Sequence, residues 1–391
     1  MKMRQLALTS AILVTGAAHA QSSVTLFGLI DTGVVYVNNQ RAVATNPNVG
    51  GSSWSLQSGN VFTSRWGLRG TEDLGGGLSA VFWLENGFNV ANGTFKNGGD
   101  LFGRQAWVGL SATQYGTVTL GRQYDFMVSY LAPLSATGSG FGGNLATHPY
   151  DNDNLNNDMR LNNAVKFSSV AFGGVKIGAM YAFSGAAGQV SNNNAYSAGI
   201  SYAFGPINLA ASYLQINRDA NNPNATGAVS TGDGDALTTG GLQRMYGAGA
   251  QYLFGPASVG LVWTHSSTEN VTGLWQGGST TTGKLTGSYL KFDNFEINGR
   301  YFLTPVLSLG ASYTYTMASF DAPKGADPHW NQVMAQADYS LSKRTDVYLE
   351  GVYQRVGGGN GLPVFDAGVY SLTPSTNEKQ VVVAVGIKHK F

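Results

Sequence analysis

The feature that most constrains this chain is an alternation of apolar and polar residues that recurs along its length. Near the C-terminus, Val383, Val385 and Ile387 would lie on one face of a strand, and Gly386 and Lys388 on the other. A period of two residues is typical of a β-strand with one apolar face. The same period occurs at 175–184, 195–204, 294–301, 308–316 and 332–341. The sequence has no run of eighteen apolar residues, so helical membrane spans are excluded.

Charged residues are confined to one face of these segments. The apolar face carries no charge, whereas Asp, Glu, Lys and Arg fall on the other face. A lysine or arginine facing lipid at mid-membrane costs roughly 2–4 kcal/mol, which explains the segregation. A soluble β-sandwich also alternates, but its water-facing side holds far more charge than a chain with 12% charged residues supplies. We therefore predict strands that cross a membrane.

The connections between the predicted strands alternate in length. Short turns alternate with long polar loops at 39–60, 89–100, 123–160, 185–194, 218–243, 268–287, 318–330 and 356–378. They join sixteen strands, approximately 24–38, 61–71, 78–88, 102–112, 117–122, 161–171, 175–184, 195–204, 207–217, 244–254, 257–267, 288–303, 306–317, 331–341, 345–355 and 379–391. Long loops on one side are typical of outer-membrane barrels. The predicted fold is all-β, a transmembrane antiparallel β-barrel of about 16 strands with a water-filled lumen.

An export signal is predicted at residues 1–20, which leaves 21–391 as a single barrel domain. Lys2 and Arg4 form a positive start, an apolar stretch follows, and Ala18 and Ala20 flank the small-x-small cleavage site. The chain carries 23 basic and 22 acidic residues without a clustered basic excess, which argues against a nucleic-acid partner. It contains no cysteine, so an exported chain of this kind must be held together without disulfides.

Five short motifs occur in order along this pattern. They are SVTLFG at 23–28, SRWGLRG at 64–70, GRQAWVG at 103–109, GTVTLGR at 116–122 and GIKHKF at 386–391. Together they resemble the general diffusion porins of Gram-negative bacteria, especially the anion-preferring branch, over the whole chain after the signal. The resemblance implies an outer-membrane homotrimer for passive diffusion of ions and small hydrophilic solutes, with the long third loop folded into the lumen of each barrel. We expect no cofactor, no metal and no enzymatic activity.

Strand parity predicts two inward arginines in the second strand. Phe62, Trp66 and Leu68 are the large apolar residues of one face, and we place them toward lipid. Because successive side chains of a strand point to opposite faces, Arg65 and Arg69 must then face the lumen.

Further arginines follow on the neighbouring strands. Placing Trp107 toward lipid turns Arg104 inward, while Arg122 ends the fifth strand and Arg160 opens the sixth. Charged residues that ring a pore set its ionic preference. The resemblance agrees, because these positions match the basic wall that faces the constriction loop in general porins. The alternative is that the arginines only pair with carboxylates and hold loops in place.

The longest loop, 123–160, is predicted to form the pore constriction. In the family this loop carries an acidic tip, but residues 133–143 contain no carboxylate. The candidate carboxylates of the loop lie nearer its ends, at Asp125, Asp151, Asp153 and Asp158. This departure favours an anion preference, although other carboxylates are also predicted to face the lumen, namely Asp31, Glu85, Asp338, Asp346 and Glu350. The stretch 151–158 lacks the spacing and terminal glutamate of an EF-hand.

Two other functions remain open at this point. A substrate-selective porin would show the same strand pattern, because parity does not reveal the geometry of a binding pocket. An outer-membrane barrel enzyme would need a histidine beside a nucleophile. The histidines are scattered, no Gly-x-Ser-x-Gly motif occurs, and His265 alone is predicted to lie near serines, at the outer rim.

Aromatic residues are predicted to form girdles at the two membrane interfaces, where lipid and lipopolysaccharide would contact them. They lie on the outward face near strand ends, at Tyr36, Tyr181, Phe183, Tyr202, Phe204, Tyr213, Tyr252, Phe254, Trp263, Tyr313 and Tyr315. Phe391 is also outward and is the last residue. The resemblance implies that it belongs to the signal read by the barrel-assembly machinery.

We predict that the mature chain begins at Gln21 and assembles into a trimer. Cleavage after Ala20 follows from the export signal, and the trimer follows from the resemblance. N-terminal sequencing and a native mass measurement on protein extracted from outer membranes check both statements. Retention of Lys2 would contradict the first, and a monomeric mass would contradict the second.

Overall fold

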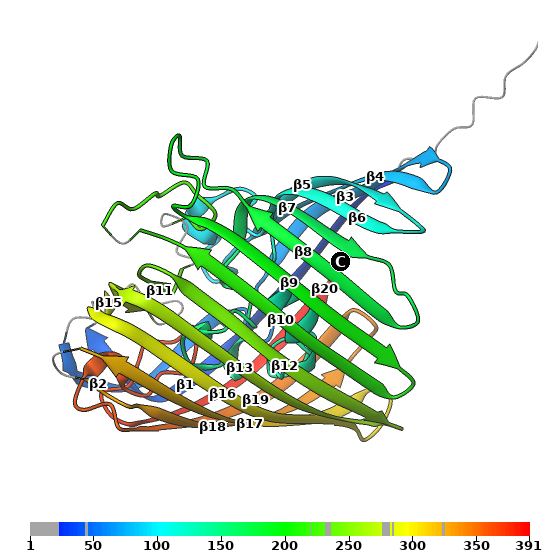
Figure 1. Ribbon diagram of the computed structural model, residues 1–391. Coiled ribbons are helices and arrows are strands. Elements are labelled where there is room, and N and C mark those ends of the chain that lie inside the picture. The colour runs from blue at the N-terminus through cyan, green and yellow to red at the C-terminus, as the bar shows by residue number, and fades with distance from the viewer. Residues whose placement is uncertain are drawn as a thin grey trace, which may run out of the picture.

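Sixteen strands form a closed antiparallel barrel in the computed structural model, which describes residues 23–43, 46–219, 221–230, 236–275, 282–283, 285–322 and 325–391. The barrel strands (Figure 1) are β1 (Ser23–Val43), β3 (Arg65–Gly75), β4 (Leu78–Gly87), β5 (Gln105–Ala112), β6 (Gly116–Gln123), β7 (Leu161–Ser169), β8 (Val175–Ala182), β9 (Asn194–Phe204), β10 (Ile207–Asn217), β12 (Gln243–Phe254), β13 (Ala257–Val271), β16 (Gly287–Phe302), β17 (Leu307–Asp321), β18 (His329–Ser340), β19 (Thr345–Gly357) and β20 (Lys379–Lys390). β20 pairs with β1 over residues 29–37 and closes the barrel. The predicted sixteen-stranded barrel is confirmed. The predicted export signal lies outside the described residues.

The other elements are few and short. Single turns of helix are η1 (Asn97–Gly99), η2 (Met127–Leu131), η3 (Ala132–Leu134), η4 (Gly143–Ala146), η5 (Pro149–Asp151) and η6 (Pro363–Phe365). Strands β11 (Thr238–Thr239), β14 (Gly273–Trp275) and β15 (Thr282–Gly283) form a separate small sheet. Within the described residues, no helix is long and apolar enough to cross a membrane.

The predicted loop 39–60 is wrong over most of its length, because the first hairpin continues beyond the predicted strand end. β1 runs on to Val43 and pairs with β2 (Asn46–Ser58). Trp54 is exposed on β2, and its ring centroid lies 4.9 Å from that of Tyr36 on β1. Glycines and serines dominate this stretch of sequence, and they conceal the alternation that would have predicted a strand.

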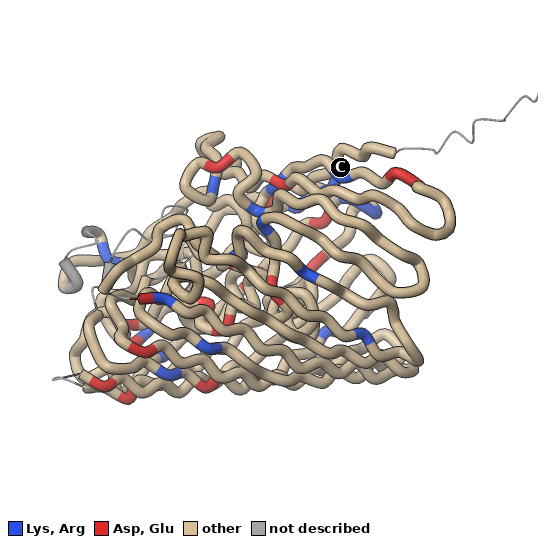
Figure 2. Tube along the Cα trace, turned by 45° about the horizontal axis from the view of Figure 1, so that its top comes forward, with Lys and Arg blue, Asp and Glu red and all other residues tan. Residues whose placement is uncertain are grey.

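Side chains alternate between the outside and the lumen, as the sequence predicts. On β1 the outward Leu26 and Val34 are 59% and 49% exposed, whereas the inward Val35 and Val37 are fully buried. Long stretches of strand carry no charged residue (Figure 2). The outer face is therefore apolar over the part of the barrel that crosses the membrane, which is the arrangement that avoids charges in lipid.

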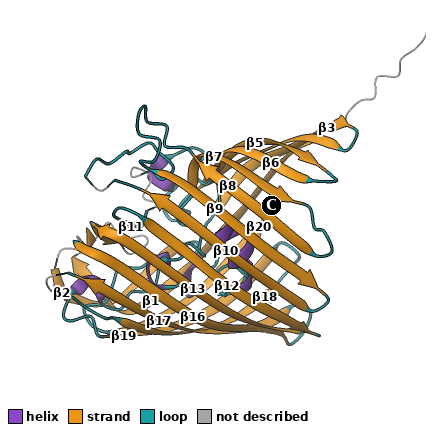
Figure 3. Ribbon diagram, viewed as in Figure 1, coloured by secondary structure: helices purple, strands orange, loops and turns teal. Residues whose placement is uncertain are grey.

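Residues 123–160, here called loop 3, connect β6 to β7 and pack against inward-facing side chains of several strands. Leu131 of η2 belongs to a buried apolar cluster with Leu214 of β10. Further along the loop, Phe141 belongs to a second buried cluster with Val37 of β1. The short helices of this segment are drawn in purple in Figure 3, where some lie behind β10 and β12. Loop 3 thus contacts the inner faces of strands that are distant in sequence.

The C-terminal residue extends the closing pair of strands. The main-chain N–H of Gly28 donates to the carbonyl of Phe391, and the N–H of Phe391 donates to the carbonyl of Gly28, each at 3.0 Å. The Phe391 ring lies where a Cβ on residue 28 would have to be placed, so glycine at that position leaves room for it. The ring is also exposed on the outer face. The assembly role implied for Phe391 stays a prediction.

We expect deletion of Phe391 to lower the yield of barrels in cells, because it removes an outward ring and the last two hydrogen bonds of the closing pair. Barrels refolded in detergent should still conduct, since β1 and β20 remain paired over residues 29–37. Outer-membrane yield and conductance are the two measurements, and Phe391→Tyr is the control that keeps a ring. A normal yield after the deletion would contradict the assembly role.

Candidate pore constriction

Glu85 organises the basic residues of the inner wall. It lies on β4, opposite Gly67 of β3, and is 2% exposed. Its Oε1 accepts a hydrogen bond from Nε of Arg104, which directly precedes β5, at 2.5 Å, and lies 3.7 Å from Nη1 of Arg65. A buried carboxylate is stable only when it is paired, so Glu85 holds both guanidinium groups at one level of the wall.

Tyr124 and Asn157 of loop 3 bring a third arginine to this pair. The Tyr124 hydroxyl accepts a hydrogen bond from Arg104 at 2.7 Å. The side-chain oxygen of Asn157 accepts from Arg104 at 3.3 Å and from Arg160 at 3.2 Å. Both guanidinium groups also lie over the Tyr124 ring, 5.9 and 5.6 Å from its centroid, and this attraction offsets part of their mutual repulsion. Arg65, Arg104 and Arg160 form one group, here called the basic cluster.

The other two predicted arginines, Arg69 and Arg122, lie apart from the basic cluster. Arg69 faces inward, but its guanidinium lies over the rings of Phe27 and Trp83, 5.5 Å from each centroid. Arg122 follows an irregularity in the pairing of β6 with β7, and it donates to the side chain of Asn162 at 2.6 Å and to a main-chain carbonyl. The structure therefore brings together three of the five arginines.

The predicted outward position of Phe62 is wrong. Residues 59–64 leave the sheet between β2 and β3, and the main-chain N–H of Phe62 donates to the carboxylate of Asp31 at 2.7 Å. Arg65 and Lys388 lie over the Phe62 ring, 5.9 and 5.5 Å from its centroid, so the ring faces inward. Parity holds only within a strand, and Phe62 is not in one. Arg65 is the first residue of β3 and does face the lumen, as parity predicts.

The predicted outward position of Trp107 is also wrong. Trp107 pairs with Trp83, which in turn pairs with the inward Arg69, so its ring lies on the inner face. The outward residues of β5 are Val108 and Leu110, which are 58% and 51% exposed. Large apolar residues occupy both faces of this strand, and the indole was assigned to the wrong one.

Lys96 adds a positive charge that strand parity does not predict. It lies in the loop 89–100, and its main-chain N–H donates to the last residue of β4 at 2.8 Å. Burial lowers the pKa of the Lys96 ammonium to about 8, with the charges of Arg104 and Arg160 acting in the same direction and that of Asp158 against them. The loop has no periodic pattern, so the sequence carries no signal that would have placed Lys96 beside the basic cluster.

The middle of loop 3 faces Arg65 and Arg104 of the basic cluster across an open space. A cavity of about 130 Å³ lies there, which is room for a few water molecules. Its lining consists of Val61, Phe62, Thr63, Arg65 and Arg104 on the wall and of Val128, Ala132, Pro133, Thr137, Gly138, Asn144, Leu155, Asn156 and Asn157 on the loop. Among these described lining residues, two are charged, and they are Arg65 and Arg104.

The four candidate carboxylates of loop 3 lie away from this lining. Asp125 and Asp151 accept hydrogen bonds from main-chain amides within the loop. Asp158 accepts a hydrogen bond from the hydroxyl of Tyr370, and Asp153 binds a histidine. The structure thus places these carboxylates in contacts within loop 3 or between loop 3 and its neighbours, and none of the four lines the cavity.

His148 attaches loop 3 to the opposite wall. Its Nδ1 lies 2.7 Å from the carboxylate of Asp153, its Nε2 lies 2.9 Å from that of Glu296 on β16, and all three side chains are completely buried. Burial alone would lower the pKa of His148, but the two carboxylates outweigh it and raise the pKa to about 10. The ring is therefore a cation at neutral pH and donates from both nitrogens.

Carboxylates on the rest of the inner wall are also paired. Lys388 lies 3.3 Å from Asp346 and 3.6 Å from Asp338. Asp31 accepts a hydrogen bond from the hydroxyl of Tyr348 at 2.5 Å. The negative charge of this wall is thus partly compensated by its own neighbours.

Known proteins resemble this barrel in sequence and in structure. A family model described as Gram-negative porin matches residues 7–359. The chain belongs to the Gram-negative porin family. It is 33% identical to an outer membrane porin protein of Bordetella pertussis and 33% identical to outer membrane porin protein 32 of Delftia acidovorans, each aligned over 100% of both chains. Among solved structures, the anion-selective porin from Comamonas acidovorans matches with a TM-score of 0.69 and 26% identity, covering 95% of this chain and 100% of that one.

Membership of this family confirms the prediction of an outer-membrane porin. Two observations concern enzymatic activity and metal binding. The Nδ1 of His265 lies 2.9 Å from Asp293, and no serine hydroxyl binds this ring within the described residues. No group of three or more His, Cys, Asp or Glu residues in the described part of the chain is arranged to hold a metal ion.

We expect the ionic preference of the porin to change between about pH 7 and pH 9. Because the pKa of Lys96 is lowered to about 8, its ammonium is charged below that pH and neutral above it, where an ordinary lysine is still charged. Loss of this charge should shift the zero-current potential in a salt gradient toward cations. Lys96→Met should show the shifted potential already at pH 7. Lys96→Arg should remove the part of the pH dependence that comes from Lys96 and leave the part that comes from other lysines of the inner wall, such as Lys166. A wild-type potential that stays constant over this range would contradict the assignment.

Proposed function

We propose that the porin is a passive channel for ions and small hydrophilic solutes that prefers anions. The observation that carries the proposal is the basic cluster, which faces the carboxylate-free part of loop 3 across the cavity. Three guanidinium groups and the Lys96 ammonium gather near two carboxylates, Glu85 and Asp158, so positive charge exceeds negative charge here. A positive constriction raises the local concentration of anions and repels cations. The relative that is named an anion-selective porin supports the same preference.

The proposal includes loop 3 as the element that narrows the lumen. This part of the proposal is supported by contacts between loop 3 and strands that are distant in sequence from β6 and β7. Glu296 and Asn298 of β16 and Gln332 of β18 bind loop 3 through His148 and through two main-chain carbonyls. A segment that begins beside the basic cluster and is attached to these strands would leave a narrow passage between itself and the cluster.

A substrate-selective porin is the second candidate function, and the aromatic residues near the cavity favour it. The two functions differ in how current depends on concentration. A general porin conducts in proportion to salt concentration, whereas a binding site inside the pore makes the current of its substrate saturate. Enzymatic activity forms no part of the proposal, because the family is one of channels and, among the described residues, the His265 ring is hydrogen-bonded to the carboxylate of Asp293 and to no serine hydroxyl.

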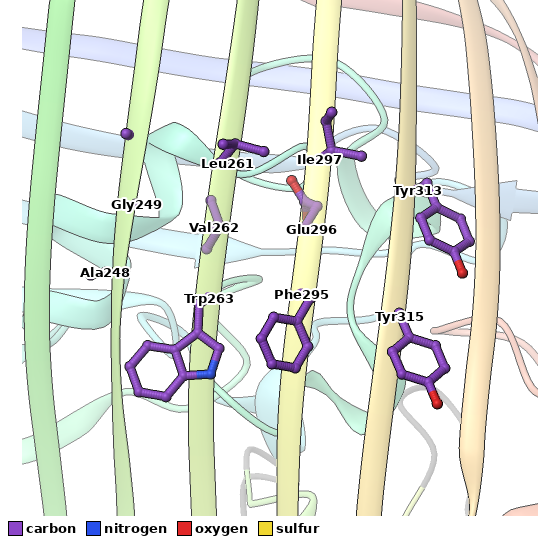
Figure 4. Close-up of a pocket in the computed structure, with 11 residues that line it drawn as sticks. Ala248, Gly249, Leu261, Val262, Trp263, Phe295, Glu296, Ile297, Tyr313 and Tyr315 are labelled. Atoms are coloured by element: carbon purple, nitrogen blue, oxygen red, sulfur yellow. The ribbon is translucent and has the colours of Figure 1, made fainter.

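The proposed assembly is a homotrimer, and one side of the barrel supports it. Trp263, Phe295 and Tyr315 lie side by side on the outer face of β13, β16 and β17 (Figure 4), as expected where rings meet lipid headgroups. The exposed large side chains of β1, β4, β5, β6 and β20 are instead aliphatic, namely Val24, Leu26, Ile30, Val34, Leu78, Val108, Leu110, Val118, Leu120, Val383, Val385 and Ile387. Rings on this side, among them the half-buried Tyr36, Trp66 and Phe82 and the exposed Phe391, are outnumbered by these aliphatic residues, and such a surface would fit a second copy of the chain.

The remaining partners of the proposal follow from the same surfaces. Lipid and lipopolysaccharide would contact the aromatic side of the barrel. The barrel-assembly machinery would bind the end of the chain at Phe391, whose ring is exposed on the outer face. Small anions and hydrophilic solutes would pass through the lumen.

We expect Arg65→Gln and Arg104→Gln to shift the zero-current potential toward cations. A unit charge at about 4 Å in water stabilises an anion and destabilises a cation by about 1 kcal/mol each, so each change should lower the anion-to-cation permeability ratio by up to about thirtyfold at low salt. The shift should shrink as salt rises, because exposed charges are screened beyond roughly 8–10 Å at physiological ionic strength. Planar-bilayer recordings in a salt gradient are the measurement.

The matched control is Arg344→Gln, which removes the same charge from an exposed short turn outside the lumen. It should keep the wild-type potential. If the wild type prefers cations, the inward carboxylates dominate and the proposed preference is wrong. If both cluster variants keep the wild-type potential, the basic cluster is structural.

A further inference from the structure

Three aromatic rings share the inner face beside the basic cluster. They are Phe27 of β1, Trp83 of β4 and Trp107 of β5. Strand β3 lies between β1 and β4, and its Gly67, which pairs with Phe27, has no side chain to separate the first two rings. The ring centroids of Phe27 and Trp83 are 4.6 Å apart. Those of Trp83 and Trp107 are 6.2 Å apart, and their planes differ by 16°. The planes of Phe27 and Trp83 differ by 52°, so among these three rings, here called the aromatic platform, the two indoles are the near-parallel pair.

Hydrogen bonds fix the orientation of the two indoles. Nε1 of Trp83 donates to Oε2 of Glu85 at 3.0 Å, and Nε1 of Trp107 donates to the side-chain oxygen of Gln105 at 3.1 Å. The other carboxylate oxygen of Glu85 binds Arg104. The aromatic platform and the basic cluster therefore share one carboxylate. A surface that is already rigid loses little conformational freedom when a ligand binds to it.

Arg69 places a positive charge at the aromatic platform. Its guanidinium lies 5.5 Å from the centroids of both Phe27 and Trp83, and its side chain is exposed. Among the described residues, no carboxylate and no other acceptor binds this guanidinium. Its N–H groups are thus available to a ligand, and a guanidinium binds a carboxylate through two parallel hydrogen bonds.

A packing role does not account for the exposure of these rings. By contrast, Trp330, a large aromatic side chain on an inward position of β18, is covered and only 1% exposed. The rings of the aromatic platform are only half-buried, and they face a lumen that normally presents polar groups. Apolar surface left in water is unfavourable, and a flat solute that covers it would recover that free energy.

We propose that the aromatic platform binds organic anions that carry a flat aromatic ring and one carboxylate. The ring of the solute stacks on Trp83 and Trp107, and its carboxylate pairs with Arg69. This inference rests on the proposed anion-preferring channel, because the basic cluster draws the anion into the lumen. A neutral sugar could stack on the same indoles but would gain nothing from the charge of Arg69.

The test compares two acids of equal charge and similar size in planar-bilayer recordings of the full-length porin. Benzoate has a flat aromatic ring, and cyclohexanecarboxylate does not. Benzoate should halve the chloride current at a concentration about fivefold lower or less, since stacking of a flat ring on an aromatic side chain contributes at least that factor. Nonspecific partition into lipid would favour the more apolar cyclohexanecarboxylate and would give the opposite order.

Variants separate the contributions of the ring and the charge. Trp107→Leu should abolish the difference between the two acids and leave the zero-current potential in potassium chloride unchanged. Arg69→Gln should weaken block by both acids. Trp263→Leu, which removes an outward indole, is the matched control and should keep the wild-type difference.

Each outcome decides the proposal. Equal block of the wild type by the two acids would overturn it, and this comparison needs no variant. A difference that survives in Trp107→Leu would overturn the assignment to the aromatic platform, and equal block by benzoate and neutral benzyl alcohol would overturn the role of Arg69. A cation-selective wild type would overturn the proposed function instead, and the comparison of the two acids would still decide whether the platform binds rings.

Discussion

In the hydrocarbon part of a membrane, each main-chain N–H and C=O group needs a partner within the protein, because lipid offers none. A sheet meets this requirement only if its first and last strands pair, as β1 and β20 do over residues 29–37, with Gly28 and Phe391 beyond them. Closure gives each strand one face toward lipid and one toward the lumen. Ionic groups are then restricted to the inner face and the rims, which is why the basic cluster and the paired carboxylates share one interior.

A closed barrel of sixteen strands encloses more space than the side chains of its wall can fill. Loop 3 supplies the missing packing, and its attachment is ionic as well as apolar. His148 lies between Asp153 and Glu296 with no exposed surface, and removing one member of such a buried set typically costs about 3–5 kcal/mol, because a charge is left without its partner. This attachment fixes the loop surface that faces the basic cluster. In the proposed channel, the width of the passage would thus depend on a contact on the opposite wall.

The period of two residues was sufficient to predict sixteen strands, because lipid imposes that period on each of them. This period gives no information where the chain leaves a strand. It therefore predicts the wrong face for Phe62 and does not predict that Lys96 lies beside the basic cluster. It also failed at Trp107, since β5 carries large apolar residues on both faces and the pattern does not say which face meets lipid. The pairing of His148 with Glu296 joins residues 148 positions apart in sequence, and no local pattern encodes it.

Glu85 shows how a chain with nearly equal numbers of basic and acidic residues can gather positive charge at the proposed constriction. Elsewhere on the inner wall one cation serves two carboxylates, as Lys388 does with Asp338 and Asp346. At Glu85 the ratio is reversed, because one carboxylate holds two guanidinium groups and a third reaches them through neutral side chains. Charges act on a permeating ion only within about 8–10 Å, so in the proposed channel this local ratio, rather than the net charge of the chain, would decide selectivity. The second oxygen of Glu85 holds an indole in place, and the same buried carboxylate therefore positions both the charge that attracts anions and the ring that would distinguish among them.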